Sequence, residues 1–160
     1  METKVTIMNT LKQGDKVPNF EVFDEQGTII KLSDYKGKKL VVFFYPAAST
    51  PTCTVEACNL RDHYKELADA GYEILGVSAD TQKKQSNFKK KYDFQYPLIA
   101  DVDKVMIQAF GVWGSKKFMG RTFDGIHRKT FVIDETGVVE RVIDNVKAKI
   151  HASQILVNSH

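Results

Sequence analysis

Apolar residues along this chain recur with two different periods, one typical of β-strands and the other of α-helices. Residues 40–45 (LVVFFY) form an uninterrupted apolar run, which predicts a central strand covered on both faces. Residues 50–70 then change to helical spacing. Thr50 suits the N-cap of this helix, Pro51 its first position and Gly71 its end. The predicted apolar face consists of Ala57, Leu60, Tyr64, Leu67 and Ala68.

The other segments alternate between the same two patterns. The turns DEQG and DETG each stand between short apolar runs, which predicts hairpins at 20–23/29–32 and 129–133/138–143. Strands alternating with helices predict one α/β domain over 1–160, compatible with a thioredoxin-like fold. That fold has a central mixed β-sheet flanked by helices and an N-terminal β-hairpin, and residues 1–8 are expected to form a flexible or extended leader. The remaining predicted strands are 74–77 and 96–100, and the remaining helices are 81–91, 102–110 and 146–157.

Composition and charge exclude several classes of function. With 42% hydrophobic and 27% charged residues, the chain is typical of a globular domain that buries a core. The net charge of +3 is too small to indicate nucleic-acid binding, and the lysine runs 89–91 and 116–117 fit solvated surfaces. No apolar run approaches the roughly 20 residues that span a bilayer, and the N-terminus lacks the pattern of a signal peptide. A cytoplasmic protein with no membrane or nucleic-acid partner is expected.

The chain contains two cysteines, Cys53 and Cys58. A permanent disulfide is unusual in the cytoplasm. The spacing is neither CxxC nor a zinc pattern, and the four histidines are scattered, so no metal and no cofactor are expected. Cys53 lies in the first turn of its predicted helix, where unpaired N–H groups and the helix dipole favour a thiolate. The pair therefore indicates redox chemistry, and the alternative is that both cysteines are small core residues.

The spacing of the two cysteines has a geometric consequence. On a regular helix, positions five residues apart point about 140° away from each other, with Cα atoms on the order of 8.7 Å apart. A disulfide needs Cα atoms about 4.4–6.8 Å apart. Cys53 and Cys58 can therefore bond only if the first turns of the helix unwind. The same geometry directs Cys53 toward the apolar face and Cys58 toward a flank.

Residues 45–62 (YPAASTPTCTVEACNLRD) resemble the active site of the peroxiredoxins, which carry a P-x-x-x-T-x-x-C pattern. The second cysteine within CTVEACNLRD is similar to that of the peroxiredoxin Q subfamily, also called bacterioferritin comigratory protein. The resemblance extends through 110–114 (FGVWG) and 125–134 (GIHRKTFVID), and covers nearly the whole chain from about Met8. Thr52 stands where many relatives carry glycine, a difference that concerns the shape of the turn and removes no reacting group.

The resemblance implies a role for five residues. Cys53 matches the peroxidatic cysteine, and Cys58 matches the resolving cysteine. Thr50 matches the threonine whose hydroxyl bonds the peroxide, and Pro46 matches the proline that shields the nucleophile from water. Arg128 matches the arginine that supports the thiolate and the charge developing during the reaction; read without the resemblance, it could be a surface ion-pair residue.

The resemblance also implies a reaction, the thiol-dependent reduction of hydrogen peroxide and organic hydroperoxides. The Cys53 thiolate attacks the peroxide, and the sulfenic acid is resolved by Cys58 as an intramolecular disulfide after local helix unfolding. Thioredoxin or a similar dithiol reductant then restores both thiols. A monomer is expected, with a dimer as the alternative.

Several other side chains stay open between structural and functional roles. Arg61 and Asp62 form either a helical surface pair or a brace for the site. His127 could act as an acid or base, although thiolate attack on a peroxide requires no histidine. The aromatic residues that either line a pocket mouth or pack in the core are Trp113, Phe118 and Phe123.

Two other functions are compatible with the cysteine pair. A thioredoxin-fold disulfide oxidoreductase is disfavoured by the absence of CxxC. A non-enzymatic redox sensor or chaperone would use the same switch. Peroxide turnover with a thioredoxin system separates the peroxidase from both.

Overall fold

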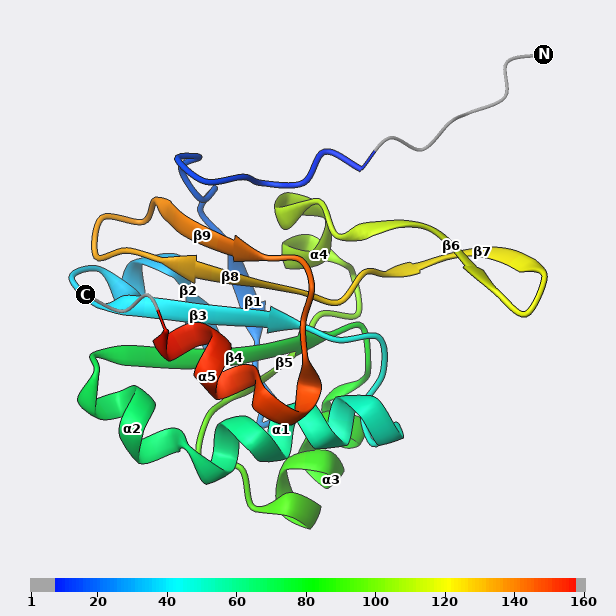
Figure 1. Ribbon diagram of the computed structural model, residues 1–160, viewed down its shortest axis with the longest axis horizontal. Coiled ribbons are helices and arrows are strands. Elements are labelled where there is room, and N and C mark those ends of the chain that lie inside the picture. The colour runs from blue at the N-terminus through cyan, green and yellow to red at the C-terminus, as the bar shows by residue number, and fades with distance from the viewer. Residues whose placement is uncertain (1–7, 158–160) are drawn as a thin grey trace.

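The computed structural model describes residues 8–157, so the expected leader over 1–8 lies outside the described residues except for Met8. Strands and helices alternate along this part of the chain (Figure 1). The strands are β1 (Glu21–Phe23), β2 (Ile29–Lys31), β3 (Lys39–Phe44), β4 (Tyr72–Ser78), β5 (Leu98–Ala100), β6 (Trp113–Phe118), β7 (Arg121–Ile126), β8 (Lys129–Ile133) and β9 (Val139–Ile143). The helices are η1 (Leu32–Tyr35), α1 (Pro51–Asp62), α2 (Tyr64–Asp69), α3 (Gln82–Tyr92), α4 (Val105–Phe110), η2 (Ala148–Ile150) and α5 (His151–Leu156).

A five-stranded mixed sheet forms the centre of the fold, in the order β5-β4-β3-β8-β9. Strand β3 runs parallel to β4 and antiparallel to β8, so Val42 lies between Leu75 and Phe131. This register confirms β3 as the central strand predicted from its continuous apolar run. The hairpins β1–β2 and β8–β9 confirm the two predicted at the ends of the chain.

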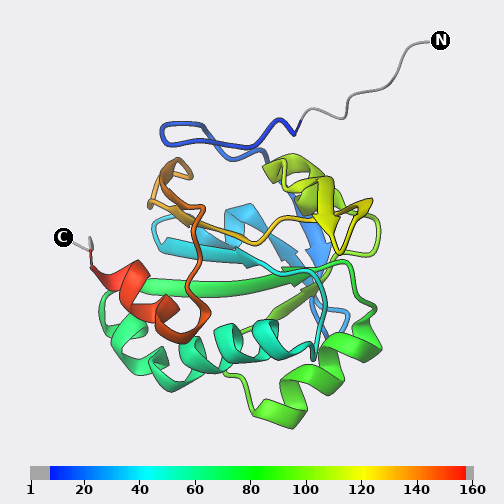
Figure 2. The ribbon, with the colours of Figure 1, turned by 45° about the vertical axis from the view of Figure 1, so that its right-hand side comes forward.

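The two faces of the sheet are covered by different elements (Figures 1 and 2). Residues of β3 alternate between the two cores. Val42 and Phe44 pack with residues of β1 and α4 on one face. Val41 and Phe43 pack with residues of α1, α2, α3 and α5 on the other. The mixed α/β fold with a flanked central sheet is therefore confirmed, and Cys53 belongs to the second of these cores.

The helix predicted over 50–70 is two helices, which corrects the prediction of one continuous element. His63 separates α1 from α2 with φ −108° and ψ 18°, outside helical geometry. Helix α2 then packs against β4, whereas α1 packs against η2 and α5. Leu67 is buried as predicted, but Ala68 is exposed because the break changes the direction of the face.

The hairpin β6–β7 was not predicted from the sequence. Its strands are rich in lysine, arginine and glycine, and most of their residues are exposed, so they carry little hydrophobic alternation. Its turn consists of Met119 and Gly120, with φ values of 53° and 77°, the positive values of a two-residue hairpin turn. Methionine is an unusual first residue for such a turn, so the local signal is weak.

Two helices in the C-terminal half of the chain are shorter than predicted. Helix α4 begins at Val105 because the Asp101 carboxylate accepts the backbone N–H groups of Val105 and Ile107. The segment predicted as one helix over 146–157 consists of η2 followed by α5. Within residues 8–157, no helix combines the length and apolar character needed to cross a membrane.

Candidate active site

Cys53 is the third residue of α1, which follows β3 after a short loop. The side chain of Cys53 is 1% exposed and packs in the same core as Ala57 and Leu60. This position places the sulfur in the first turn of the helix, where backbone N–H groups have no acceptor within the helix and favour negative charge. The predicted inward orientation of Cys53 is confirmed.

Arg128 contacts the sulfur of Cys53 from the segment that leads into the strand beside β3. It lies just before β8, which pairs antiparallel with β3 so that Lys129 stands opposite Phe44, at the end of β3 that leads to the site. Nη2 of Arg128 lies 3.1 Å from Sγ of Cys53. Burial alone lowers the pKa of Arg128, but Glu56 and Cys53 raise it by more, so the guanidinium remains charged.

Glu56 completes the contact, although the sequence pattern had not marked it as a site residue. Its side chain is fully buried, and its Oε1 lies 2.5 Å from Nη1 of Arg128. Burial raises the pKa of Glu56 to about 7, although the charge and hydrogen bond of Arg128 lower it. The spacing i, i+3 from Cys53 was the available signal, because it puts both side chains on one face of a helix. Arg128 thus bridges two side chains of α1.

The loop before α1 is held by an aspartate from the neighbouring strand. The backbone N–H of Ala48 donates to Oδ2 of Asp80 at 2.7 Å, and the Ser78 hydroxyl donates to the same oxygen at 2.7 Å. Ser49, the next loop residue, has a positive φ of 63°. Asp80 follows β4, which lies beside β3, and only the folded sheet brings it to this loop.

Thr50 occupies the predicted N-cap position, but its side chain does not cap the helix. Its hydroxyl donates to the carbonyl of Ala47 at 2.9 Å. This bond fixes the proton of the hydroxyl and leaves its oxygen lone pairs available as acceptors. Pro46 directly follows the buried Tyr45 and is itself exposed, so its role in shielding the nucleophile stays a prediction.

Cys58 lies farther along the same regular helix, and both cysteines are free thiols. Its side chain is half-buried, which agrees with the predicted position on a flank. Burial raises the pKa of Cys58, while Arg61 lowers it and Asp62 raises it. Because α1 is continuous from Pro51 to Asp62, the geometric barrier to a disulfide within an intact helix applies to this structure.

The structure gives the contacts of the charged candidates Arg61 and His127. Arg61 forms the predicted surface pair, contacting Asp62 at 2.9 Å, and it also donates to the backbone carbonyl of Tyr92 at the end of α3 at 2.8 Å. His127 lies with Nε2 3.1 Å from the carbonyl of Ser115, which ties it to the hairpin β6–β7. His127 therefore has a structural contact of its own.

The aromatic candidates and one further cation belong to or border the hairpin β6–β7. Trp113 is half-buried against the core, whereas Phe118 is 68% and Phe123 46% exposed, so neither phenylalanine is a core residue. Lys116 donates to the carbonyl of Ile126 at 2.8 Å. Burial lowers the pKa of Lys116, Arg128 lowers it further and Cys53 raises it, so the hairpin brings a second cation toward the site.

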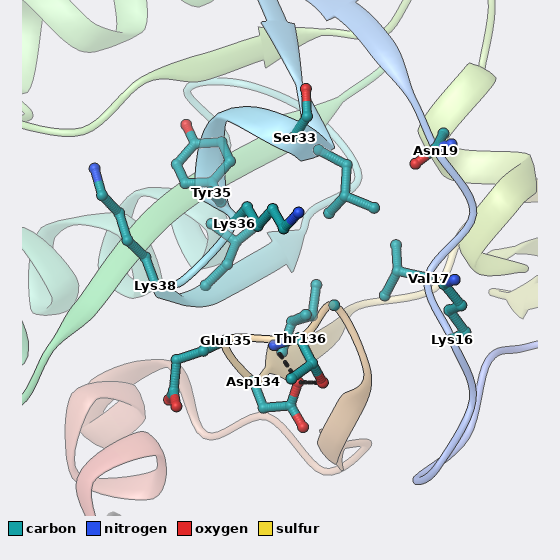
Figure 3. A pocket seen from close by; sticks show the side chains of 14 residues that line it. Lys16, Val17, Asn19, Ser33, Tyr35, Lys36, Lys38, Asp134, Glu135 and Thr136 are labelled. Atoms are coloured by element: carbon teal, nitrogen blue, oxygen red, sulfur yellow. Dashed lines mark hydrogen bonds between the residues drawn. The ribbon is translucent and has the colours of Figure 1, made fainter.

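A cavity of about 420 Å³ lies at the opposite end of β3 (Figure 3). Its lining includes Leu40 and Ile133, a pair that lies four residues from the Phe44–Lys129 pair at the site, or roughly 13 Å along the strand. Positively charged lysine and negatively charged carboxylate side chains surround the cavity, and neither cysteine lines it. Among residues 8–157, no group of three or more His, Cys, Asp or Glu side chains could hold a metal ion.

Comparisons with known proteins bear on the family and the fold. A model of the AhpC/TSA family matches residues 13–142. Peroxiredoxin Bcp of Escherichia coli is 46% identical over 93% of this chain and 96% of its own length. Peroxiredoxin Bcp of Bacillus subtilis is 41% identical over 92% of this chain and 94% of its own length.

Two solved structures share the fold at similar identity. Peroxidoxin BcpB from Mycobacterium tuberculosis has a TM-score of 0.82 and 38% identity, covering 93% of this chain and 96% of its own. Peroxiredoxin Q from Xanthomonas campestris has a TM-score of 0.82 and 36% identity, covering 88% and 89%. The thioredoxin-like fold and the resemblance drawn from residues 45–62 are thereby confirmed. The chain belongs to the AhpC/TSA family and, within it, to the Bcp or peroxiredoxin Q type of peroxiredoxin, a class of thiol peroxidases.

Proposed function

We propose that this protein reduces hydrogen peroxide and organic hydroperoxides with Cys53 as the nucleophile and Cys58 as the resolving thiol. The observation that carries the proposal is the contact of 3.1 Å between the Arg128 guanidinium and the sulfur of the buried Cys53. A cation and a helix N-terminus together favour a thiolate, the reactive form of cysteine.

In the first step the Cys53 thiolate attacks one peroxide oxygen. The S–O bond forms while the O–O bond breaks, so sulfur loses two electrons and the peroxide gains them. The departing oxygen takes the proton that the attacked oxygen carried, leaving as an alcohol or as water, and a solvent proton completes the sulfenic acid. Arg128 and the N–H groups of the first helical turn supply donors for the developing charge, and the Thr50 oxygen supplies an acceptor for the peroxide proton.

In the second step the Cys58 thiol attacks the sulfenic sulfur, the S–S bond forms, the S–O bond breaks and water leaves. The helix between the cysteines must unwind first. Unwinding breaks the contact of Glu56 with Arg128 and the hydrogen bond from the Tyr96 hydroxyl to the Ala57 carbonyl. Oxidation therefore takes apart the arrangement that stabilises the thiolate.

In the third step a thioredoxin-like dithiol protein transfers two electrons by thiol–disulfide exchange, which restores both thiols and oxidises the reductant. A reducing compartment such as the cytoplasm supplies such proteins. Because both cysteines belong to one helix, a monomer suffices for the cycle. The bacterioferritin comigratory protein of Xanthomonas campestris, solved in trapped intermediate/ligand complexes, has alkyl peroxide reduction activity, which supports organic hydroperoxides as substrates here.

The proposal is tested by stopped-flow reduction of hydrogen peroxide and tert-butyl hydroperoxide, with mass-spectrometric mapping of the oxidised cysteines. The wild-type protein is expected to give a Cys53–Cys58 disulfide and to turn over with thioredoxin. Cys53→Ser is expected to abolish turnover. The matched variant Cys58→Ser is expected to form one sulfenic acid on Cys53 and then stop. Substantial turnover by Cys53→Ser overturns the assignment, and disulfide exchange without peroxide reduction indicates an oxidoreductase instead.

A further inference from the structure

The peptide group between Ala47 and Ala48 has a hydrogen bond at each end. Its N–H, carried by Ala48, donates to Oδ2 of Asp80 at 2.7 Å. Its carbonyl, carried by Ala47, accepts the Thr50 hydroxyl at 2.9 Å. One rigid, planar unit therefore connects the Asp80 carboxylate with the hydroxyl that the proposed mechanism uses at the peroxide.

The direction of each of these hydrogen bonds follows from the atoms that make it. A carbonyl oxygen only accepts, so Thr50 supplies the proton of its bond to Ala47. Oδ2 of Asp80 accepts a second donor, the Ser78 hydroxyl at 2.7 Å, and the backbone N–H of Asp80 donates back to the Ser78 oxygen at 3.3 Å. Ser78 is fully buried at the end of β4. The carboxylate is thus anchored on the central sheet and presented to the loop.

The loop between Ala48 and Thr50 has a backbone conformation that needs such an anchor. Ser49 has a φ of 63°, in the left-handed region that residues other than glycine rarely adopt. Backbone of this kind persists where the surrounding contacts hold it in place. Thr50 is the N-cap residue of α1, but its side chain makes no capping bond. The Thr50 hydroxyl is therefore directed by the Ala47 carbonyl and not by the helix.

We propose that Asp80 is a positioning residue for the peroxidase site, because it fixes the peptide group that orients the Thr50 hydroxyl. The inference rests on the proposed role of Thr50 as an acceptor for the peroxide proton. While its own proton is bonded to Ala47, the hydroxyl presents only lone pairs to the site. Without Asp80 the Ala48 N–H loses its acceptor, the peptide plane is free to turn, and the Thr50 proton can point at the peroxide instead.

The charge of Asp80 acts in the same direction as its position. A hydrogen bond to an ionised acceptor is stronger than one between neutral groups. Bonds in a chain polarise one another, so the bond at the N–H strengthens the bond at the carbonyl of the same peptide. Within the described part of the chain, the side-chain hydrogen bonds of Asp80 involve Ala48 and Ser78 and not Cys53 or Arg128. Losing Asp80 should therefore weaken the peroxide step without changing the thiolate.

The test compares two reactions of Cys53 in the full-length Cys58→Ser protein. Stopped-flow reduction of hydrogen peroxide uses the Thr50 acceptor, whereas alkylation by iodoacetamide needs only the thiolate. Asp80→Ala is expected to slow peroxide reduction roughly tenfold, the effect of losing about one hydrogen bond. Alkylation is expected to stay within about twofold, because the surroundings of the sulfur are unchanged. An unchanged peroxide rate, or an equal loss in alkylation, overturns the inference.

Asp80→Asn is the matched variant. Its amide oxygen can take the place of Oδ2 and accept both the Ala48 N–H and the Ser78 hydroxyl. This variant is expected to keep the peroxide rate within about threefold of the parent, since both bonds remain and only the charge is lost. A loss as large as that of Asp80→Ala overturns the inference, because it would show that the bonds themselves do not position the hydroxyl.

A double-variant comparison separates orientation of the hydroxyl from a general loosening of the loop. Thr50→Val removes the hydroxyl and keeps the shape of the side chain. In that background Asp80→Ala is expected to change the peroxide rate by less than about twofold, because its effect passes through the missing group. The same fold loss in both backgrounds overturns the inference.

Amide hydrogen exchange of the reduced wild-type protein tests the bond without any variant. The Ala48 N–H is expected to exchange at least about tenfold more slowly than in an unstructured peptide. Exchange at the rate of an unstructured peptide overturns the inference, even if Asp80→Ala fails to fold. Failure of the proposed function would instead appear as peroxide turnover by Cys53→Ser, on which the exchange of Ala48 does not depend.

Discussion

Cys53 and Cys58 belong to one helix, yet they differ in the surroundings that govern thiol chemistry. Cys53 is buried in the first turn of α1, with a guanidinium 3.1 Å from its sulfur. Cys58 is half-buried farther along, and burial raises its pKa, with Arg61 as the neighbouring cation that opposes this. The surroundings of Cys53 favour a reactive thiolate, whereas those of Cys58 favour a protonated thiol close to the surface.

The residues between the two cysteines link the two steps of the proposed mechanism. Glu56 is held by Arg128, and the carbonyl of Ala57 is held by Tyr96. Joining the cysteines in the proposed disulfide would require this stretch to unwind, so these two contacts would resist that disulfide. The comparison predicts that changes around Cys53 alter the first chemical step, whereas changes around Cys58 alter the step that follows.

The largest effect on the first step is expected from Arg128→Lys. A lysine keeps the charge but carries its donors on one nitrogen, so it cannot reproduce the two separate nitrogens with which Arg128 reaches Glu56 and Cys53. The second-order rate constant for peroxide reduction by the Cys58→Ser protein is expected to fall roughly 10²–10³-fold, the usual effect of losing a donor to developing charge. Arg61→Lys is the matched control, and stopped-flow fluorescence of Trp113 measures both. A similar loss in the control would remove the distinction between the two cations.

The free energy of unfolding should depend on pH in a way that reveals the protonation of Glu56, which is buried near Cys53. Glu56 has a pKa of about 7 against an ordinary 4.5, so its contribution to the free energy of unfolding is complete below pH 4.5 and declines as pH rises to 7. At about 1.4 kcal/mol per pH unit, the decline is roughly 3 kcal/mol. His151 acts in the opposite direction, because its lowered pKa of about 4 makes stability rise between pH 4 and 6.5.

In the wild-type protein these two trends nearly cancel, and Glu56→Gln leaves only the rise due to His151. Urea unfolding of the reduced proteins should therefore show Glu56→Gln gaining on the wild type by roughly 3 kcal/mol from pH 4.5 to pH 7. The exposed Glu21→Gln is the control, with an expected change within about 0.5 kcal/mol at each pH. Parallel curves for Glu56→Gln and the wild type would contradict the raised pKa.

The elements that the sequence predicted well are those with a strong local signal. The apolar run of β3, the N-cap position of Thr50 and the DETG turn of β8–β9 each depend on neighbouring residues, and the structure has them where expected. The hairpin β6–β7 was missed because its strands are mostly exposed and its turn uses Met119. The break at His63 was missed because the packing of α2 against β4, a tertiary contact, accompanies it.

The candidate site divides in the same way. Cys53 could be predicted from its place after a buried strand, and Arg128 from the resemblance to a family. Glu56 and Asp80 were not assigned, because each contacts a partner that only the folded sheet and helices bring near. Glu56 and Arg128 are 72 positions apart in the chain. A buried polar side chain gives no sign in the sequence that its partner is distant.

A smaller effect, on the second step, is expected from Asn59→Ala. Asn59 ties α1 to the C-terminal segment through the carbonyl of Lys149 and the N–H of Ala152, both at 2.8 Å. Losing these bonds should lower the free energy of unfolding by roughly 1–3 kcal/mol and speed disulfide formation up to about tenfold, since unwinding becomes easier. The second phase of Trp113 fluorescence measures the rate. The exposed Asn87→Ala on α3 is the control, and an unchanged second phase in Asn59→Ala would contradict the anchoring role.

The smallest effect is expected at the Cys58 thiol itself, from Arg61→Gln. Arg61 lowers the pKa of Cys58, so its removal should leave less thiolate and slow alkylation of Cys58 in a Cys53→Ser background by roughly two- to threefold. Asp62→Asn should have the opposite sign, because Asp62 raises the same pKa. Both variants should leave the first oxidation of Cys53 unchanged in the wild-type background, since Arg61 contacts Asp62 and Tyr92 rather than the buried sulfur. A change in that first phase as large as the change in alkylation would mean that the two thiols share one electrostatic environment.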